Sequence, residues 1–202
     1  MTGCAGQAPA QDRPVADVSI HDEDGLPHGN VLPTPYDVPS VALTDTAGRP
    51  YDLARDARKP LSLVFFGYTN CPDVCRVVMA TIASSLTRLD ASHRDKVGMV
   101  FVTTDPARDT PAVVRAYLDR FDPRFTGLTG PIGRIKRVGT ALGVPVAKGH
   151  RLASGGYDVS HGTQVVGMVS GGRAPFVWTA GTSPSGLADD VTAILDDKVP
   201  GL

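Results

Sequence analysis

Short apolar runs alternate with amphipathic segments along most of the chain, which is the pattern of an α/β domain. Residues 61–66 and 97–102 are almost entirely apolar, and they predict central strands that are covered on both faces. Between them, apolar residues recur every three or four positions as far as Leu89. This spacing predicts a helix that begins at Cys71 and Pro72, because proline is favoured in the first turn.

The remaining pattern completes a mixed sheet with helices. A hairpin is expected in residues 41–53, with its turn at Ala47 and Gly48. Further strands are expected at residues 125–128, 165–170 and 176–179, and further helices at residues 111–121, 131–142 and 184–197. Residues 148–164 are polar and lack periodicity, so we expect an inserted loop there, of a length that is usually functional. The expected fold is α/β, with a central mixed sheet flanked by helices.

The first 39 residues differ from the rest in composition. They are rich in proline and glycine, and we expect a flexible tether with one ordered stretch near a single folded domain at residues 40–202. Small residues directly before Cys4 resemble the end of a bacterial lipoprotein signal, in which that cysteine carries the lipid. We therefore expect Met1 to stand where a signal peptide was removed, and Cys4 to anchor the protein at the outer face of the cell membrane. The alternative is an N-terminal cysteine without a special role.

Charge and hydropathy exclude several classes of partner. The net charge is -1, from 20 basic and 21 acidic residues, so no electrostatic footprint for nucleic acid or anionic lipid exists. The chain also has no run of 18 apolar residues, so we expect no membrane span. Separately, we expect the protein to be a monomer.

The cysteine pair Cys71 and Cys75 is the sequence pattern that most clearly indicates a chemical function. A disulfide across four residues would constrain little of the unfolded chain, so stability is a poor reason for the pair. Helical spacing would place both sulfurs on one side, and the helix start would favour the thiolate form of Cys71. Thiolates select Cu(I), zinc or iron–sulfur clusters, but zinc sites and clusters need more protein ligands than this pair supplies. A low-coordinate Cu(I) ion, in contrast, can be bound by two sulfur ligands and one nitrogen ligand.

The nitrogen ligand must come from a histidine. Two histidines, His21 and His28, lie in the tether, and we expect them to be solvated. A third, His93, lies in a polar turn and is expected at the surface. His150 and His161 flank the inserted loop, and only His161 is held at one end by a following strand. Spacing alone leaves the choice open. The five are His21, His28, His93, His150 and His161.

Four segments of the sequence resemble a known family. Residues 65–75, FFGYTNCPDVC, strongly resemble the cysteine signature of the Sco/SenC copper chaperones. Residues 102–111, 125–130 and 157–161 look like three further blocks of that family, and the likeness covers roughly residues 41–195. It implies a thioredoxin-like fold, membrane tethering, and Cu(I) or Cu(II) bound by Cys71, Cys75 and His161. It also implies a role in assembling the CuA centre of cytochrome c oxidase.

The sequence departs from this family at two positions. Arg76 stands where members commonly have proline, and Ser160 stands where they usually carry an acid before the histidine. A carboxylate there would orient the imidazole and raise its basicity, so its loss weakens the case for Cu(II) more than for Cu(I). Asp158 is the nearest acidic alternative. Other nearby acids, Asp73, Asp105 and Asp109, are expected as helix-dipole, loop and cap residues.

Two functions of different classes remain. The first is a metallochaperone, a transfer protein and not an enzyme, that delivers copper to the CuA-bearing oxidase subunit. The second is an enzyme, a thiol–disulfide oxidoreductase, in which Cys71 and Cys75 are a redox pair that reduces the target's cysteines. Another copper chaperone or a thioredoxin-like reductant is an expected further partner.

Overall fold

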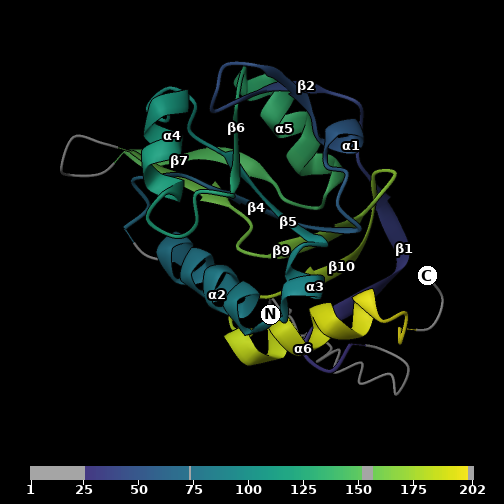
Figure 1. Ribbon diagram of the computed structural model, residues 1–202. Helices are drawn as coiled ribbons and strands as arrows, with labels where there is room; N and C mark the ends of the chain where they lie inside the picture. The colour runs from purple at the N-terminus through teal and green to yellow at the C-terminus, as the bar shows by residue number, and fades with distance from the viewer. Residues whose placement is uncertain (1–25, 73, 152–156, 200–202) are drawn as a thin grey trace, which may run out of the picture.

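The computed structural model describes residues 26–72, 74–151 and 157–199, with the backbone alone for residues 148–151 and 157–161. Within these ranges, one eight-stranded sheet has the strand order β1-β10-β9-β4-β5-β6-β2-β3 (Figure 1). β4 pairs in parallel with β5 and β5 with β6, and the other neighbours are antiparallel. The strands are β1 (Asn30–Asp37), β2 (Ala42–Asp45), β3 (Pro50–Asp52), β4 (Leu61–Gly67), β5 (Val97–Thr103), β6 (Thr126–Thr129), β9 (Val165–Val169) and β10 (Arg173–Trp178).

Helices cover both faces of this sheet. Alternate residues of a strand point to opposite faces, so Leu63 and Phe65 of β4 join one buried cluster while Val64 and Phe66 join the other. Residues of α2, α4 and α6 complete the first cluster, and residues of α1 and α5 complete the second. The helices are α1 (Leu53–Asp56), α2 (Val74–Arg88), α3 (Ala91–Arg94), α4 (Pro111–Leu118), α5 (Ile132–Ala141) and α6 (Pro184–Leu195). The predicted mixed sheet flanked by helices is confirmed.

The start of α4 agrees with its sequence pattern, whereas the start of α2 does not. Thr110 caps α4 by accepting a hydrogen bond from the backbone N–H of Val113, and Pro111 occupies the first turn. α2 begins at Val74, so Cys71 precedes the helix instead of opening it. A turn holds this cysteine, because its N–H donates to the Tyr68 carbonyl at 3.2 Å.

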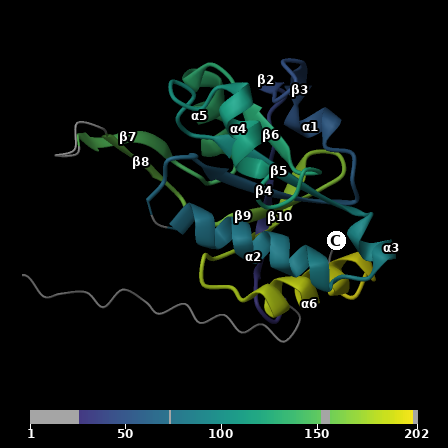
Figure 2. The same cartoon turned by 60° about the vertical axis from the view of Figure 1, so that its left-hand side comes forward.

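Residues 148–164 do not form the irregular loop that we expected. Their backbone forms most of an antiparallel hairpin of β7 (Val146–Arg151) and β8 (Tyr157–His161), which is separate from the main sheet. Figure 2 shows this hairpin projecting from the body of the molecule. The pairing is irregular between Lys148 and Arg151, and a bulge of this kind interrupts the two-residue alternation that identifies a strand.

The described structure includes residues before the expected boundary at residue 40. Among them, β1 pairs with β10. Leu26 is buried, and the backbone N–H of His28 donates to the buried Asp190 carboxylate at 3.3 Å. The indole N–H of Trp178 donates to the same carboxylate at 2.8 Å. The segment before β1 is therefore attached to the face that α6 covers.

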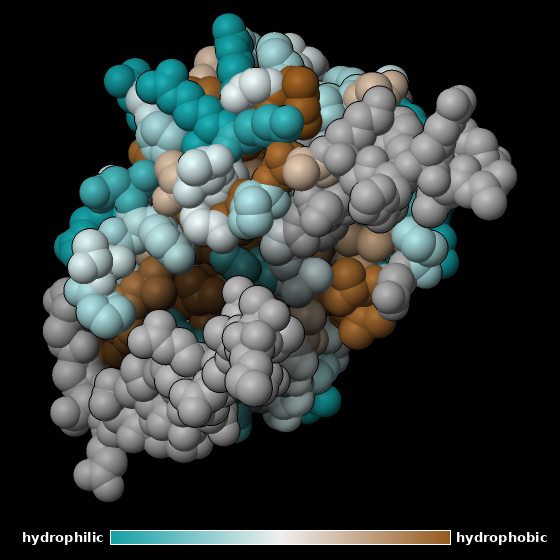
Figure 3. Space-filling view, turned by 180° about the vertical axis from the view of Figure 1, so that it is seen from behind, coloured by the Kyte–Doolittle hydropathy of each residue, from teal (hydrophilic) through white to brown (hydrophobic). Residues whose placement is uncertain are grey.

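In the described part of the chain, no helix is long and apolar enough to cross a membrane. Figure 3 shows that, on the face seen from behind, hydrophobic residues form separate patches bordered by hydrophilic ones. Scattered patches of this kind are ordinary on folded proteins.

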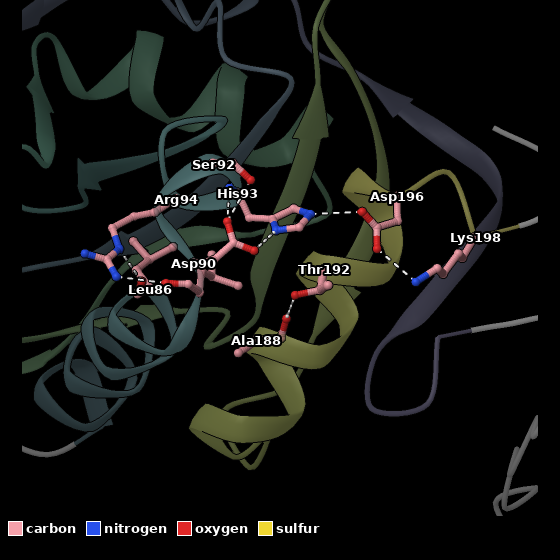
Figure 4. Close-up of polar contacts among 10 residues, drawn as sticks. Leu86, Asp90, Ser92, His93, Arg94, Ala188, Thr192, Asp196 and Lys198 are labelled. Carbon is pink, nitrogen blue, oxygen red and sulfur yellow. Dashed lines mark hydrogen bonds and ion pairs between the residues drawn. The ribbon is translucent and has the colours of Figure 1, made fainter.

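His93 connects three helices at the end of the molecule that lies away from the cysteines. Its Nδ1 lies 2.5 Å from an Asp90 oxygen and its Nε2 lies 2.9 Å from an Asp196 oxygen (Figure 4). The guanidinium of the neighbouring Arg94 donates to the carbonyls of Leu86 and Leu89. The imidazole is partly exposed, and through these contacts α3 joins the ends of α2 and α6.

The two carboxylates raise the pKa of His93, with the hydrogen bond to Asp196 as the largest cause and that to Asp90 as the next. Hydrogen bonds, first from the His93 backbone N–H, lower the pKa of Asp90. A raised histidine pKa stabilises the fold fully below the unfolded value of about 6.5 and loses that effect as pH rises through the folded value. The lowered carboxyl pKa adds stability above about pH 4 that is lost as pH falls further.

We expect the His93→Gln variant to lose more unfolding free energy at about pH 5.5 than at about pH 8.5. Urea unfolding of both proteins at the two pH values measures this difference. His28→Gln is the matched control, because its side chain has no such carboxylate pair among the described contacts. An equal loss at both pH values for His93→Gln would contradict the prediction.

Candidate metal centre

The cysteine pair follows the carboxyl end of β4, where Gly67 allows a close approach. A Cβ atom at this position would lie 3.3 Å from the sulfur of Cys75. It would also lie 3.0 Å from the rings of Phe65 and Phe101, which is closer than side chains normally tolerate. The Gly67 carbonyl accepts hydrogen bonds from the backbone N–H and the hydroxyl of Thr104, at 2.7 and 3.1 Å. The end of β4 is thus fixed against the segment that follows β5.

Both cysteines are buried and adjacent. Cys71 is 8% exposed and Cys75 is fully buried, and no disulfide joins them. Their side chains share a hydrogen bond, so the two sulfurs are close enough to contact one ion. Burial, and next that hydrogen bond, raises the pKa of Cys75. The raised pKa keeps this thiol protonated at neutral pH.

Asp109 holds the loop that carries Cys71. Its side chain is fully buried, and it accepts hydrogen bonds from the N–H and the hydroxyl of Thr69, at 3.0 and 2.6 Å. It also accepts one from the Thr103 hydroxyl, at 2.6 Å. The carboxylate therefore connects the cysteine loop to the end of β5 and to the approach to α4. The sequence assigned Asp109 to a loop or cap, and the threonines after two buried strands were the signal that could have revealed its partners.

Arg108 supports the same loop from the solvent side. Its guanidinium carbon lies 5.8 Å from the centre of the Tyr68 ring, a cation–π arrangement. The same guanidinium forms an ion pair with Asp105, which is nearly completely buried. Asp105 is thus engaged in loop structure, in line with its sequence interpretation.

The backbone brings His161 to the same edge of the sheet as the cysteine loop. His161 ends β8, and β9 begins at Val165, which pairs with Phe65 near the carboxyl end of β4. The side chains of His161, Ser160 and Asp158 lie outside the described part of the structure, as does the whole of Asp73. Among the side chains that are described, no group of three histidine, cysteine or acidic residues could hold a metal ion. The three-ligand set thus stays a prediction.

A comparison with protein-family models shows which family the chain belongs to. Residues 37–196 match the SCO1/SenC model. The chain belongs to the SCO1/SenC family. Membership agrees with the thioredoxin-like fold and with the four blocks of sequence that first indicated it. The SCO1/SenC match begins at Asp37, the last residue of β1, and ends one residue after α6.

Individual SCO1/SenC relatives agree with this assignment. A copper-bound structure of ScoI from Bradyrhizobium japonicum is 33% identical, with a TM-score of 0.68, and the match covers 77% of this chain and 98% of that one. A putative copper-binding protein of Stutzerimonas stutzeri is 33% identical over 138 residues, which cover 67% of each chain. Mitochondrial SCO2 of Saccharomyces cerevisiae is 35% identical over 96 residues, or 48% of this chain and 32% of the yeast protein. The match thus spans about a third of that longer relative.

We expect Asp109→Asn to destabilise the protein by about 1–3 kcal/mol, because the amide would turn a donor toward donors in a buried site. Urea unfolding measures this loss. Asp119→Asn is the matched control, since that carboxylate is 50% exposed in its ion pair with Arg115 and should contribute less than about 1 kcal/mol. An Asp109→Asn protein as stable as the wild type would contradict the role assigned to this carboxylate.

Proposed function

We propose that this protein binds copper as cargo, through the sulfurs of Cys71 and Cys75 and the imidazole of His161. The observation that carries the proposal is the contact between two buried cysteine side chains beside the strand end that His161 approaches. Paired sulfur ligands with little water access suit a soft, low-coordinate ion, which is the chemistry of Cu(I). The copper bound in the Bradyrhizobium ScoI structure supports the choice of metal.

The same geometry supports a role in copper delivery. Cys71 lies at the surface end of the pair, with 8% of its area exposed, so an incoming ligand would reach this sulfur first. We infer that copper passes by ligand exchange to the CuA-bearing subunit of cytochrome c oxidase, outside the cytoplasm. Oxidation of the pair to a disulfide removes both thiolates and therefore releases the ion. Another copper chaperone would supply the copper, and a thioredoxin-like reductant would restore the thiols.

The contact between the two sulfurs also favours a second function. Thiols within hydrogen-bond contact can close to a disulfide with little movement, as a thiol–disulfide oxidoreductase requires. The raised pKa of the buried Cys75 opposes this role, because the thiolate is the attacking species. Turnover on a disulfide-bonded peptide of the CuA-bearing subunit, measured without copper, would favour the enzyme over the chaperone.

We expect Cys71→Ser and Cys75→Ser each to lower Cu(I) affinity by more than about 100-fold, because loss of an outer-shell partner already costs about 10–100-fold. His161→Ala should lower it by about 10-fold, since both thiolates remain. Competition titration with a chromophoric Cu(I) chelator measures all three.

Cys4→Ser is the matched control for these titrations, because it removes a thiol that lies outside the pair. Its Cu(I) affinity should equal that of the wild type. Unchanged binding in either serine variant of the pair would reject the copper site, whereas unchanged binding in His161→Ala alone would reject only the third ligand.

We further propose that Cys4 anchors the protein to the membrane. The proline-rich segment between Cys4 and the start of the sheet would then be the tether. When the chain is expressed behind a bacterial lipoprotein signal, the wild type should sediment with membranes and Cys4→Ser should appear in the released fraction. Equal membrane association of both proteins would contradict the anchor.

A further inference from the structure

Tyr117 has a buried hydroxyl without a hydrogen-bond partner among the described residues. This tyrosine lies on α4 and is only 3% exposed. Nearly all buried hydroxyls in folded proteins have a partner, so an exception of this kind needs an explanation. Such a hydroxyl is free to donate to an acceptor that forms in another state of the protein.

The surroundings of Tyr117 point to the cysteine pair. Its ring lies between those of Phe101 and Phe121, with centroid distances of 5.5 and 5.3 Å. The ring of Phe101 in turn borders Gly67, and so does the sulfur of Cys75. Tyr117 and both cysteines belong to the same buried cluster.

The causes of the pKa shift of Tyr117 also point to the cysteine pair. Burial raises the pKa of Tyr117 most, and the next causes are the charges of Cys75 and then Cys71, ahead of those of Arg76 and Asp109. The phenol therefore keeps its proton at neutral pH and remains a donor. Asp109 is a poor alternative acceptor, because Thr69 and Thr103 already occupy its carboxylate.

The state of the sulfurs decides whether Tyr117 has an acceptor. A neutral thiol is a weak acceptor, whereas a thiolate accepts a charge-assisted and much stronger hydrogen bond. When two thiols bind Cu(I), they release two protons and leave a complex with one net negative charge. This complex lies in the core, where an unpaired charge is costly. A buried donor from the same cluster, which has no partner in the described structure, would stabilise the complex by forming a hydrogen bond to sulfur.

We propose that Tyr117 is a positioning residue that donates its hydroxyl hydrogen bond to a thiolate sulfur of the Cys71–Cys75 pair when the pair is ionised or metal-bound. The proposal deepens the copper site and rests on it for the metal-bound state. Tyr117 keeps its own proton throughout, so both released protons come from the cysteines.

The test is Tyr117→Phe, which removes the hydroxyl and keeps the ring that Phe101 and Phe121 contact. We expect Cu(I) affinity to fall by about 10-fold, the effect of losing one charge-assisted hydrogen bond. The sulfur-to-Cu(II) charge-transfer band should move to longer wavelength, because a thiolate without its donor gives up electrons more easily. Without copper, Tyr117→Phe should be at least as stable as the wild type, since the missing hydroxyl has no partner in that state.

Tyr51→Phe is the matched control. Tyr51 is a half-buried tyrosine on β3 that packs against the cluster on the other face of the sheet, so its hydroxyl should affect neither copper affinity nor the spectrum. A Tyr117→Phe protein with the affinity and spectrum of the wild type would overturn the proposal. A loss of stability without copper, together with unchanged binding, would show a purely structural role and would also overturn it.

A measurement without copper separates this proposal from the proposed function. The hydroxyl stabilises the reduced, ionised pair, so the dithiol–disulfide potential of Tyr117→Phe should be more negative by about 30 mV, which is a tenfold change in the equilibrium constant. The measurement belongs at alkaline pH, because the raised pKa of Cys75 keeps its thiol protonated at neutral pH. If the wild type bound no copper, a shifted potential would still support the role of Tyr117, and an unshifted one would overturn it.

Discussion

The carboxylate of Asp109 is the constraint on which the position of the cysteine pair depends. A buried charge is tolerated only when hydrogen bonds replace its lost water, and the three bonds to Asp109 come from neutral donors. Two come from Thr69, two residues before Cys71, and one comes from Thr103 at the end of β5. The fold cannot satisfy this carboxylate without placing the cysteine loop against the neighbouring strand. Thr104 reinforces the arrangement, because it bonds the last carbonyl of β4.

This constraint acts at an edge where separate parts of the chain converge. The parallel strands β4 and β5 both end there, and the antiparallel β9 begins beside Phe65. Ligands in α/β proteins commonly bind outside the carboxyl ends of parallel strands, because loops from different segments meet there. Cys71 leaves β4 at this edge and His161 enters β9 at the same edge, although 90 residues of sequence separate them. The sheet thus brings the proposed ligands together without any local sequence relation.

The sequence predicted the parts of this arrangement that depend on local pattern. The buried strands at Leu61–Gly67 and Val97–Thr103 and the cap at Thr110 follow from hydropathy and capping preferences, which act over a few residues. The roles of Asp109 and Tyr117 depend on contacts across the sheet, which no local pattern reports. The β7–β8 hairpin was missed for a different reason: its irregular pairing removes the alternation that marks a strand. His161 was identified through the family resemblance and not through spacing.

The two departures from the family act on opposite sides of the proposed site. Ser160 removes the acid that commonly precedes the histidine, so the imidazole has less support as a ligand. On the sulfur side, Arg76 adds an exposed positive charge directly after Cys75, and Tyr117 offers a buried donor. In the proposal above, the Tyr117 hydroxyl would stabilise negative charge on sulfur. Metal affinity in this protein should therefore depend more on the thiolates and less on the imidazole than in relatives with the acid, which favours the monovalent over the divalent ion. Under the proposed function, the redox state of the pair would then be the main control on whether copper is held.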